Sequence, residues 1–195
     1  MARRTREQVE DAIAAAVRAE LAERGYQGVT FEGVAHRART SKPVLYRRYS
    51  SRSEMVLFAL GRSLRFEFPI GLPDRSLRDG VLLMLRYARE RFDTIGADTF
   101  RALIGEADQP TLALLSGAMD AAERALADQV IAPAVARGEL GSRPLAPGVL
   151  RVPYAILREQ ILFRTGPAMT LEEITDTICL PLFKAVSTSV PHAPE

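Results

Sequence analysis

The sequence predicts an all-α protein, in which a three-helix amino-terminal domain is followed by a larger helical bundle. Apolar residues recur at intervals of three and four, helix-capping residues stand before these segments, and strand-like alternation is lacking. The amino-terminal domain is expected to span residues 1–52 and the second domain residues 53–195.

The first helix is expected between Thr5 and Arg24. Its apolar residues share one helical face, and Thr5 and Gln8 have the spacing of a capping box. Gly25 follows as a helix-ending residue. The chain therefore opens on one amphipathic helix.

Three further helix starts follow within about thirty residues of Gly25. Thr30 can cap a second helix, and a third begins near Ser41 with Pro43 in its first turn. Ser51 and Glu54 form a second capping box, which opens a fourth helix. The two short helices at Thr30 and Ser41, joined by a turn of about four residues, predict a helix-turn-helix.

The charge of the chain is concentrated in this region. Residues 1–62 carry 12 Arg or Lys against 7 Asp or Glu, a net charge of +5, whereas the remainder carries 14 against 17, a net of −3. Between Gly33 and Ser53 lie six cations and no acid: Arg37, Arg39, Lys42, Arg47, Arg48 and Arg52. A solvated charged face has interspersed signs, so this basic block favours a surface that meets phosphate.

A helix that enters the major groove cannot be apolar on its outer face, so only Val44 or Leu45, with Tyr49, is expected to pack inward. We expect base edges to be contacted by Lys42, Val44 and Arg47. The DNA backbone is expected to be contacted by Thr30, Thr40, Ser41, Tyr46, Arg48, Tyr49 and Arg52, with Arg3 and Arg4 of the amino-terminal arm along the duplex.

A spaced set of residues within about residues 6–60 resembles the DNA-binding region of the TetR/AcrR family of bacterial transcriptional regulators. The set comprises Thr30, Val34-Ala35, Ala38, Ser41, Leu45-Tyr46, Tyr49, Arg52 and Glu54-Met55. Two residues depart from the usual pattern. Arg39 occupies the turn where the family usually has glycine, and Gly33 weakens the second helix unless close packing against the first helix requires it.

The resemblance implies a ligand-responsive repressor. It implies a homodimer that binds a pseudo-palindromic, double-stranded operator and is released by a small-molecule effector, with the second domain providing the ligand pocket and the dimer interface. Two alternatives from other classes remain open. One is a helical small-molecule-binding protein or enzyme without specific DNA binding, and the other is a nonspecific DNA-compacting protein.

The second domain carries weaker signals. Helices are expected over about residues 77–92, 99–106, 111–136, 149–164 and 171–186, with a kink at Pro181. Large adaptable side chains at mid-helix positions, which more often than not are plain core, are the candidates for a ligand pocket: Met84, Tyr87, Phe100, Met119 and Tyr154. Apolar stripes on the last two helices serve the monomer core or a dimer interface, for which the candidates are Leu157, Ile161, Ile174, Ile178 and Leu182.

Composition and motifs give no support for catalysis. The two histidines and the single Cys179 form no metal or nucleophile pattern, so we expect no enzyme activity, cofactor or metal, and Cys179 is expected to be a small buried hydrophobe. No 18-residue uncharged run and no apolar leader are present. The expected location is therefore the cytoplasm, without membrane contact.

Overall fold

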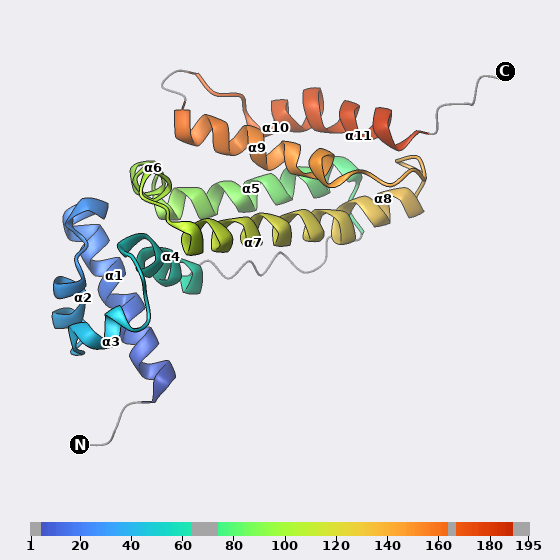
Figure 1. The fold of residues 1–195 in the computed structure, drawn as a ribbon. Coiled ribbons are helices and arrows are strands. Elements are labelled where there is room, and N and C mark those ends of the chain that lie inside the picture. The colour runs from blue at the N-terminus through green and yellow to red at the C-terminus, as the bar shows by residue number, and fades with distance from the viewer. Residues whose placement is uncertain (1–4, 64–73, 164–166, 189–195) are drawn as a thin grey trace. The chain divides into compact units, whose positions relative to one another are not determined.

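The computed structural model describes residues 5–63, 74–163 and 167–188, and within these ranges the chain forms helices and loops without strands (Figure 1). The predicted all-α fold is confirmed. Two compact units are present: unit 1 comprises Met1–Arg65 and Ile95–Ser116, and unit 2 comprises Phe66–Thr94 and Gly117–Glu195. The domain boundary between residues 52 and 53 stays a prediction.

Helix α1, Arg6–Gly28, begins at the predicted capping box. Thr5 Oγ1 accepts a hydrogen bond from Gln8 N–H at 3.2 Å, and Gln8 Oε1 accepts one from Thr5 N–H at 2.9 Å. At Gly25 the backbone leaves helical geometry, with φ 65° and ψ −179°. Only glycine adopts this conformation readily, so the regular helix ends where the sequence predicts.

Helices α2, Phe31–Arg37, and α3, Lys42–Tyr46, form the predicted helix-turn-helix. Thr30 caps α2 by accepting a hydrogen bond from Gly33 N–H at 3.0 Å. Pro43 occupies the first turn of α3, where its missing N–H leaves no helical hydrogen bond unmade. Leu45 is the fully buried residue of α3.

Helix α4, Arg52–Ser63, also starts with side-chain caps. Ser51 Oγ accepts a hydrogen bond from Glu54 N–H at 3.1 Å. The Glu54 carboxylate accepts from Ser50 N–H at 2.6 Å. In a capping box this carboxylate would accept from the N–H of Ser51, so here it bonds to the residue one position earlier.

The core of unit 1 is formed where α1 packs on α2, α4 and α6, Ala97–Gly105. Helix α3 packs on α2, and α4 also contacts α6. These helices bury a common set of apolar side chains, which includes Ile13, Val17, Val34, Leu45, Met55, Val56 and Leu103. Helix α3 is thus attached to a core that is larger than the helix-turn-helix itself.

Glu20 of α1 is a charged side chain buried at the edge of this core. Arg37 Nε donates to Glu20 Oε1 at 3.0 Å, and Arg24 Nη1 lies 3.4 Å from Glu20 Oε2. A Cβ at position 33 would lie 2.9 Å from the same Oε2. Close packing of α2 on α1 therefore favours glycine at position 33, because a larger residue would displace a paired, buried carboxylate.

The turn between α2 and α3 is a Schellman motif. Arg39 N–H donates to His36 O at 3.2 Å, and Thr40 N–H donates to Ala35 O at 3.0 Å. The motif needs a residue with positive φ after the helix, and Arg39 provides it with φ 52°. The arginine therefore leaves the hydrogen bonds of the turn in place, and the cost falls on its own backbone conformation.

Unit 2 is a helical bundle whose elements follow the predicted segments. It contains nearly all of α5 (Leu77–Ile95), the later part of α7 (Gln109–Leu126), the π-helical segment η1 (Ala127–Ile131), α8 (Ala132–Ala136), α9 (Pro147–Phe163), α10 (Leu171–Glu173), the π-helical segment η2 (Ile174–Cys179) and α11 (Leu180–Ser187).

Each π-helical segment is followed two residues later by a proline, Pro133 after η1 and Pro181 after η2. Proline lacks an N–H, and its ring crowds the carbonyl group four residues earlier in an α-helix. A wider π turn gives that carbonyl group room. The disruption expected at Pro181 is therefore accompanied by a local widening of the helix, which continues through α11.

The core of unit 2 is built from side chains of α5, α7, α9, η2 and α11. Its most deeply buried members include Leu77, Met84, Leu85, Leu126, Leu157, Ile174 and Phe183. Cys179 lies in this core, and burial raises the pKa of its thiol to about 12. The thiol is therefore uncharged at neutral pH, in agreement with its predicted role as a small hydrophobe.

Gly138, which ends α8, provides a test of the cost of positive φ. It has φ 75°, so we expect Gly138→Ala to lower the free energy of unfolding by about 1 kcal/mol. Gly117→Ala is the control, because Gly117 lies inside α7 with no atom near its Cβ direction, and it is expected to raise that free energy by up to about 1 kcal/mol. Urea unfolding measures both, and shifts of the same sign would contradict the expectation.

Candidate nucleic-acid interface

Helix α3 separates an inner from an outer surface. Leu45 and Tyr49 are buried, and the Tyr49 ring lies 5.3 Å from the Phe58 ring of α4. Tyr49, predicted to contact the DNA backbone, is instead part of the core, with 4% of its surface exposed. Arg47 is exposed and Val44 is half-buried on the other side. This placement leaves both side chains on the outer side of α3.

Tyr46 is the exposed aromatic residue of α3, with 62% of its surface accessible. Its ring stacks on Phe31 at the start of α2, with centroids 4.4 Å apart and planes inclined by 6°. The stack orients the phenol at the outer surface. Ser41 is also exposed, and its hydroxyl makes no capping hydrogen bond, whereas Thr30 Oγ1 is occupied by the α2 cap.

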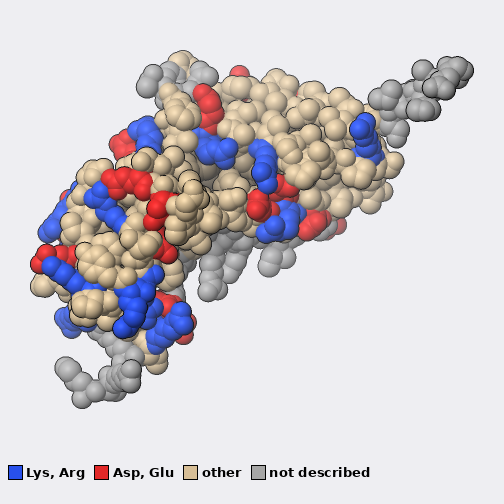
Figure 2. All heavy atoms as spheres, in the orientation of Figure 1, with Lys and Arg blue, Asp and Glu red and all other residues tan. Residues whose placement is uncertain are grey.

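The basic block is free of acids along the sequence but not in space. Blue and red side chains lie next to one another over the helix-turn-helix at the lower left of Figure 2. Four of its six cations are paired with carboxylates from outside the block: Lys42 with Glu32 at 2.7 Å, Arg48 with Glu10 at 2.9 Å, Arg37 with Glu20 at 3.0 Å and Glu23 at 2.6 Å, and Arg52 with Glu106 at 2.5 Å. Among the described residues, the remaining two, Arg39 and Arg47, form no ion pair.

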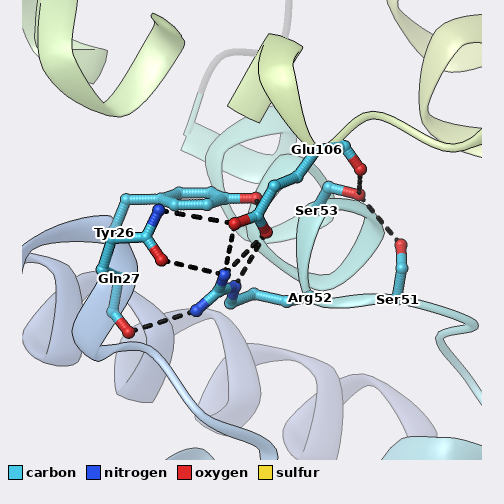
Figure 3. Close-up of polar contacts among 6 residues, drawn as sticks. All are labelled: Tyr26, Gln27, Ser51, Arg52, Ser53 and Glu106. Atoms are coloured by element: carbon cyan, nitrogen blue, oxygen red, sulfur yellow. Dashed lines mark hydrogen bonds and ion pairs between the residues drawn. The ribbon is translucent and has the colours of Figure 1, made fainter. Parts of the chain in front are cut away.

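Arg52, predicted to contact the DNA backbone, lies in a network that joins the end of α1 to the start of α4 (Figure 3). Its guanidinium donates to the Glu106 carboxylate at 2.5 and 2.7 Å and to Gln27 O at 3.1 Å. It also lies over the Tyr26 ring, 5.0 Å from the centroid. All three guanidinium nitrogens of Arg52 therefore already donate to Glu106 or Gln27, so the N–H groups that a phosphate would need are occupied.

The same network continues to the start of α7. Ser53 Oγ lies 3.1 Å from Thr111 Oγ1, and Ser50 Oγ donates to Asp108 Oδ2 at 3.1 Å. Asp108 Oδ1 in turn accepts from Thr111 N–H at 2.9 Å. We call this set the α4-start network; its members are Tyr26, Gln27, Ser50, Arg52, Ser53, Glu106, Asp108 and Thr111. It connects residues 106–111 to the end of α1 and to the start of α4 within unit 1.

The network also shifts the protonation of its members. The hydrogen bond from Arg52 holds the pKa of the Glu106 carboxyl below its ordinary value. Hydrogen bonds from Thr111 likewise lower the pKa of the Asp108 carboxyl. Burial, followed by the nearby Glu106 charge, raises the pKa of Tyr26 to about 12. At neutral pH both carboxyls are therefore ionised and the phenol is neutral.

The remaining predicted site residues lie in several environments. Arg3 and Arg4 fall outside the described residues. Met84 and Tyr154 are buried in the core of unit 2, whereas Phe100 is buried in unit 1. Tyr87 and Met119 are half-buried, each beside an arginine: Arg91 lies 4.5 Å from the Tyr87 centroid, and Arg158 Nη1 lies 3.4 Å from Met119 Sδ.

The five predicted dimerisation residues divide into two groups. Leu157 and Ile174 are buried in the core of unit 2, so they stabilise their own protomer. Ile161, Ile178 and Leu182 are half-buried. Dimerisation through α9 and α11 stays a prediction, and these three residues are the members of the set with surface left for a partner.

Sequence reasoning missed the carboxylates that pair with the basic block. Glu20 gave a detectable signal, because it lies on the same helical face as the apolar residues Ile13 and Val17 of α1. Glu106 gave none, since it lies 54 residues after Arg52 and no local pattern connects the two.

Two family models match the chain. Residues 13–58 match the model described as bacterial regulatory proteins of the tetR family, and residues 73–178 match the tetracyclin repressor-like C-terminal domain. The chain belongs to the TetR family of bacterial transcriptional regulators. The recognition made from the sequence is confirmed, and with it a helix-turn-helix DNA-binding domain and a non-enzyme class of protein.

Relatives in sequence and a solved structure are similar to this chain. Uncharacterized HTH-type transcriptional regulators of Mycobacterium bovis and Mycobacterium tuberculosis are 31% identical over 171 residues, which cover 83% of this chain and 81% of theirs. A crystal structure of a candidate TetR-family transcriptional regulator from Rhodococcus sp. is similar in fold, with a TM-score of 0.55 and 23% identity over 93% of this chain and all of that one.

Two negative findings apply to the described residues alone. None of their helices has the length and apolar character needed to cross a membrane. Nor do they bring together three or more His, Cys, Asp or Glu side chains in an arrangement that could hold a metal ion.

The α4-start network is expected to make the stability of this TetR protein depend on acid pH. The pKa values of Glu106 and Asp108 are depressed by folding, so their contribution is present above the unfolded pKa, about 4, and is lost as pH falls through the folded values. We expect Glu106→Gln to reduce the slope of stability against pH below about pH 5. Urea unfolding at a series of pH values measures this, and an unchanged slope would exclude the contribution of Glu106.

Glu32 is expected to oppose DNA binding, because its carboxylate holds Lys42 at 2.7 Å on an exposed surface. We expect Glu32→Gln to tighten binding to duplex DNA of any sequence by about three- to tenfold and to steepen the salt dependence by about one phosphate contact per protomer. Glu90→Gln on α5 makes the same change of net charge outside unit 1. Fluorescence anisotropy of both variants over a range of salt tests this; equal effects would point to net charge alone.

Proposed function

We propose that the protein is a ligand-responsive repressor that binds a pseudo-palindromic operator as a homodimer and is released by a small molecule. The observation that carries the proposal is the division of α3, with Leu45 fixed in the core and Arg47 exposed without a carboxylate partner among the described residues. An arginine so placed can donate two hydrogen bonds to a guanine edge in the major groove.

The pairing of the basic block favours specific over nonspecific DNA binding. Nonspecific affinity grows with the number of phosphates that a protein neutralises. Four of the six cations in the block already have carboxylate partners, so few are available for this purpose. A DNA-compacting protein is therefore less well supported than a regulator that selects a site.

A homodimer is expected because one short helix contacts too few base pairs for specificity. Two copies related by a dyad would place their α3 helices in half-sites about 34–36 Å apart. Regulators of the TetR family typically act as dimers with ligands, which supports this arrangement. We place the protein in the cytoplasm, where its DNA would lie.

Release by an effector requires tighter ligand binding to a conformation that does not fit the operator. Coupling of this kind usually amounts to about 1–3 kcal/mol, or roughly 5- to 150-fold in affinity. The α4-start network supports such coupling, because any rearrangement of residues 106–111 changes the partners of Arg52 and Ser53 at the start of α4.

The proposed function is tested with the intergenic DNA upstream of the protein's own gene and a scrambled duplex of the same composition. We expect the upstream duplex to bind more tightly, and the preference to persist as salt rises, when titrations are followed by fluorescence anisotropy. Equal, steeply salt-dependent binding to both would indicate a nonspecific basic surface. No binding at low salt would exclude the DNA-binding proposal.

In the same assay, Arg47→Ala is expected to reduce the preference between the two duplexes by about 1–3 kcal/mol, because a base contact is lost. Arg89→Ala is the matched control, since Arg89 lies on the surface of α5 in unit 2 and pairs with Asp93 at 2.9 Å. A preference that Arg47→Ala leaves unchanged would remove Arg47 from the base-contacting set.

A further inference from the structure

Arg39 is the one non-glycine residue with positive φ in the part of the chain that the structure describes. The three other positions with positive φ are Gly25, Gly96 and Gly138. The turn at Gly138, which follows α8, has the same two hydrogen bonds as the turn at Arg39, which follows α2. Gly138 N–H donates to Val135 O at 3.0 Å, and Glu139 N–H donates to Ala134 O at 2.9 Å. Glycine is therefore sufficient for a turn with these hydrogen bonds, and the turn alone does not explain an arginine at position 39.

The Arg39 side chain is exposed, and its guanidinium has no partner among the described residues. The neighbouring cations differ in this respect. Arg37 is held by Glu20 and Glu23, and Lys42 is held by Glu32. The five N–H donors of Arg39 are thus left for a group that the protein itself does not supply.

Position and chemistry together indicate the missing group. Arg39 lies three residues before the first residue of α3, on the segment that leads into the helix with the exposed Arg47. A guanidinium matches the geometry of phosphate oxygens and remains charged at every physiological pH. Residues held in unfavourable backbone conformations are concentrated at functional sites, where the surrounding structure maintains them.

We propose that Arg39 donates to a backbone phosphate of the DNA beside the groove that α3 enters, an inference that rests on the proposed function. Because phosphates are the same in every sequence, this contact adds affinity and fixes the position of α3 without selecting bases. The chain thus has an arginine where glycine would give a more stable turn, and the free protein is less stable in exchange for a DNA contact.

A purely local role predicts a different result. A cation after the last turn of α2 could act on the helix dipole alone. Arg39→Gly would then leave DNA binding unchanged. If Arg39 contacts a phosphate, the same substitution raises the stability of the free protein and weakens DNA binding, two effects of opposite sign.

The experiment uses the full chain, the upstream and scrambled duplexes, and three variants. We expect Arg39→Gly to raise the urea midpoint, to weaken binding to both duplexes alike by about three- to tenfold, and to lower the salt slope by about 0.9 per protomer. Arg39→Lys keeps the charge and is expected to keep most of the slope. Gly138→Arg places an arginine in the matching turn of unit 2 and is expected to lower the urea midpoint without changing DNA affinity.

Two results would overturn the proposal while the proposed function stands. Arg39→Gly could bind both duplexes as the unchanged protein does, with the same slope, or it could lose affinity for the upstream duplex alone, which would mean a base contact. If the protein without substitutions binds neither duplex, both the proposed function and this contact are excluded. The titration of that protein therefore distinguishes failure of the proposed function from failure of the Arg39 contact alone.

Discussion

The burial of Leu45 is the contact on which the outer surface of the helix-turn-helix depends. Helix α3 has five residues, too few to be stable by itself, so its position is set by packing rather than by its own hydrogen bonds. Leu45 is fully buried in a core shared by α1, α2 and α4. The Tyr46 ring on Phe31 and the Arg48 ion pair with Glu10 then fix the two sides of the helix.

Local features of the fold were predictable from the sequence, because their causes are local. The capping box of Thr5, the cap of Thr30 and the break at Gly25 each depend on residues at most three apart. The paired charges were not predictable, because Glu10 precedes Arg48 by 38 residues and Glu106 follows Arg52 by 54. Tyr49 shows the same limit, since whether it faces the core or solvent depends on where Phe58 of α4 lies.

A net charge of +5 in residues 1–62 therefore overstates the charge that DNA can use. Exposed ion pairs contribute little stability, so a phosphate can replace Glu32 at Lys42 at small cost. Arg52 differs, because a phosphate would have to replace the Glu106 carboxylate and the Gln27 carbonyl together, and the contact with Tyr26 as well. The cations of the basic block therefore differ in how readily they can bind phosphate. Arg39 and Arg47 form no ion pair among the described residues, Lys42 has a carboxylate partner that a phosphate can replace, and Arg52 is held by several partners at once.

The difference between paired and unpaired cations affects the selectivity of DNA binding. Phosphate contacts strengthen binding to every sequence equally, whereas base contacts strengthen binding to one, so a protein gains selectivity when few of its cations are free and one of them faces the base edges. Carboxylates from α1, α2 and the residues after α6 withdraw most of the block from the phosphate backbone and leave Arg47 on the outer side of α3. Acids lower the net charge of a sequence, which by itself counts against DNA binding. In the folded chain the same carboxylates pair with most of the basic block, and this pairing is the condition under which α3 could select a site.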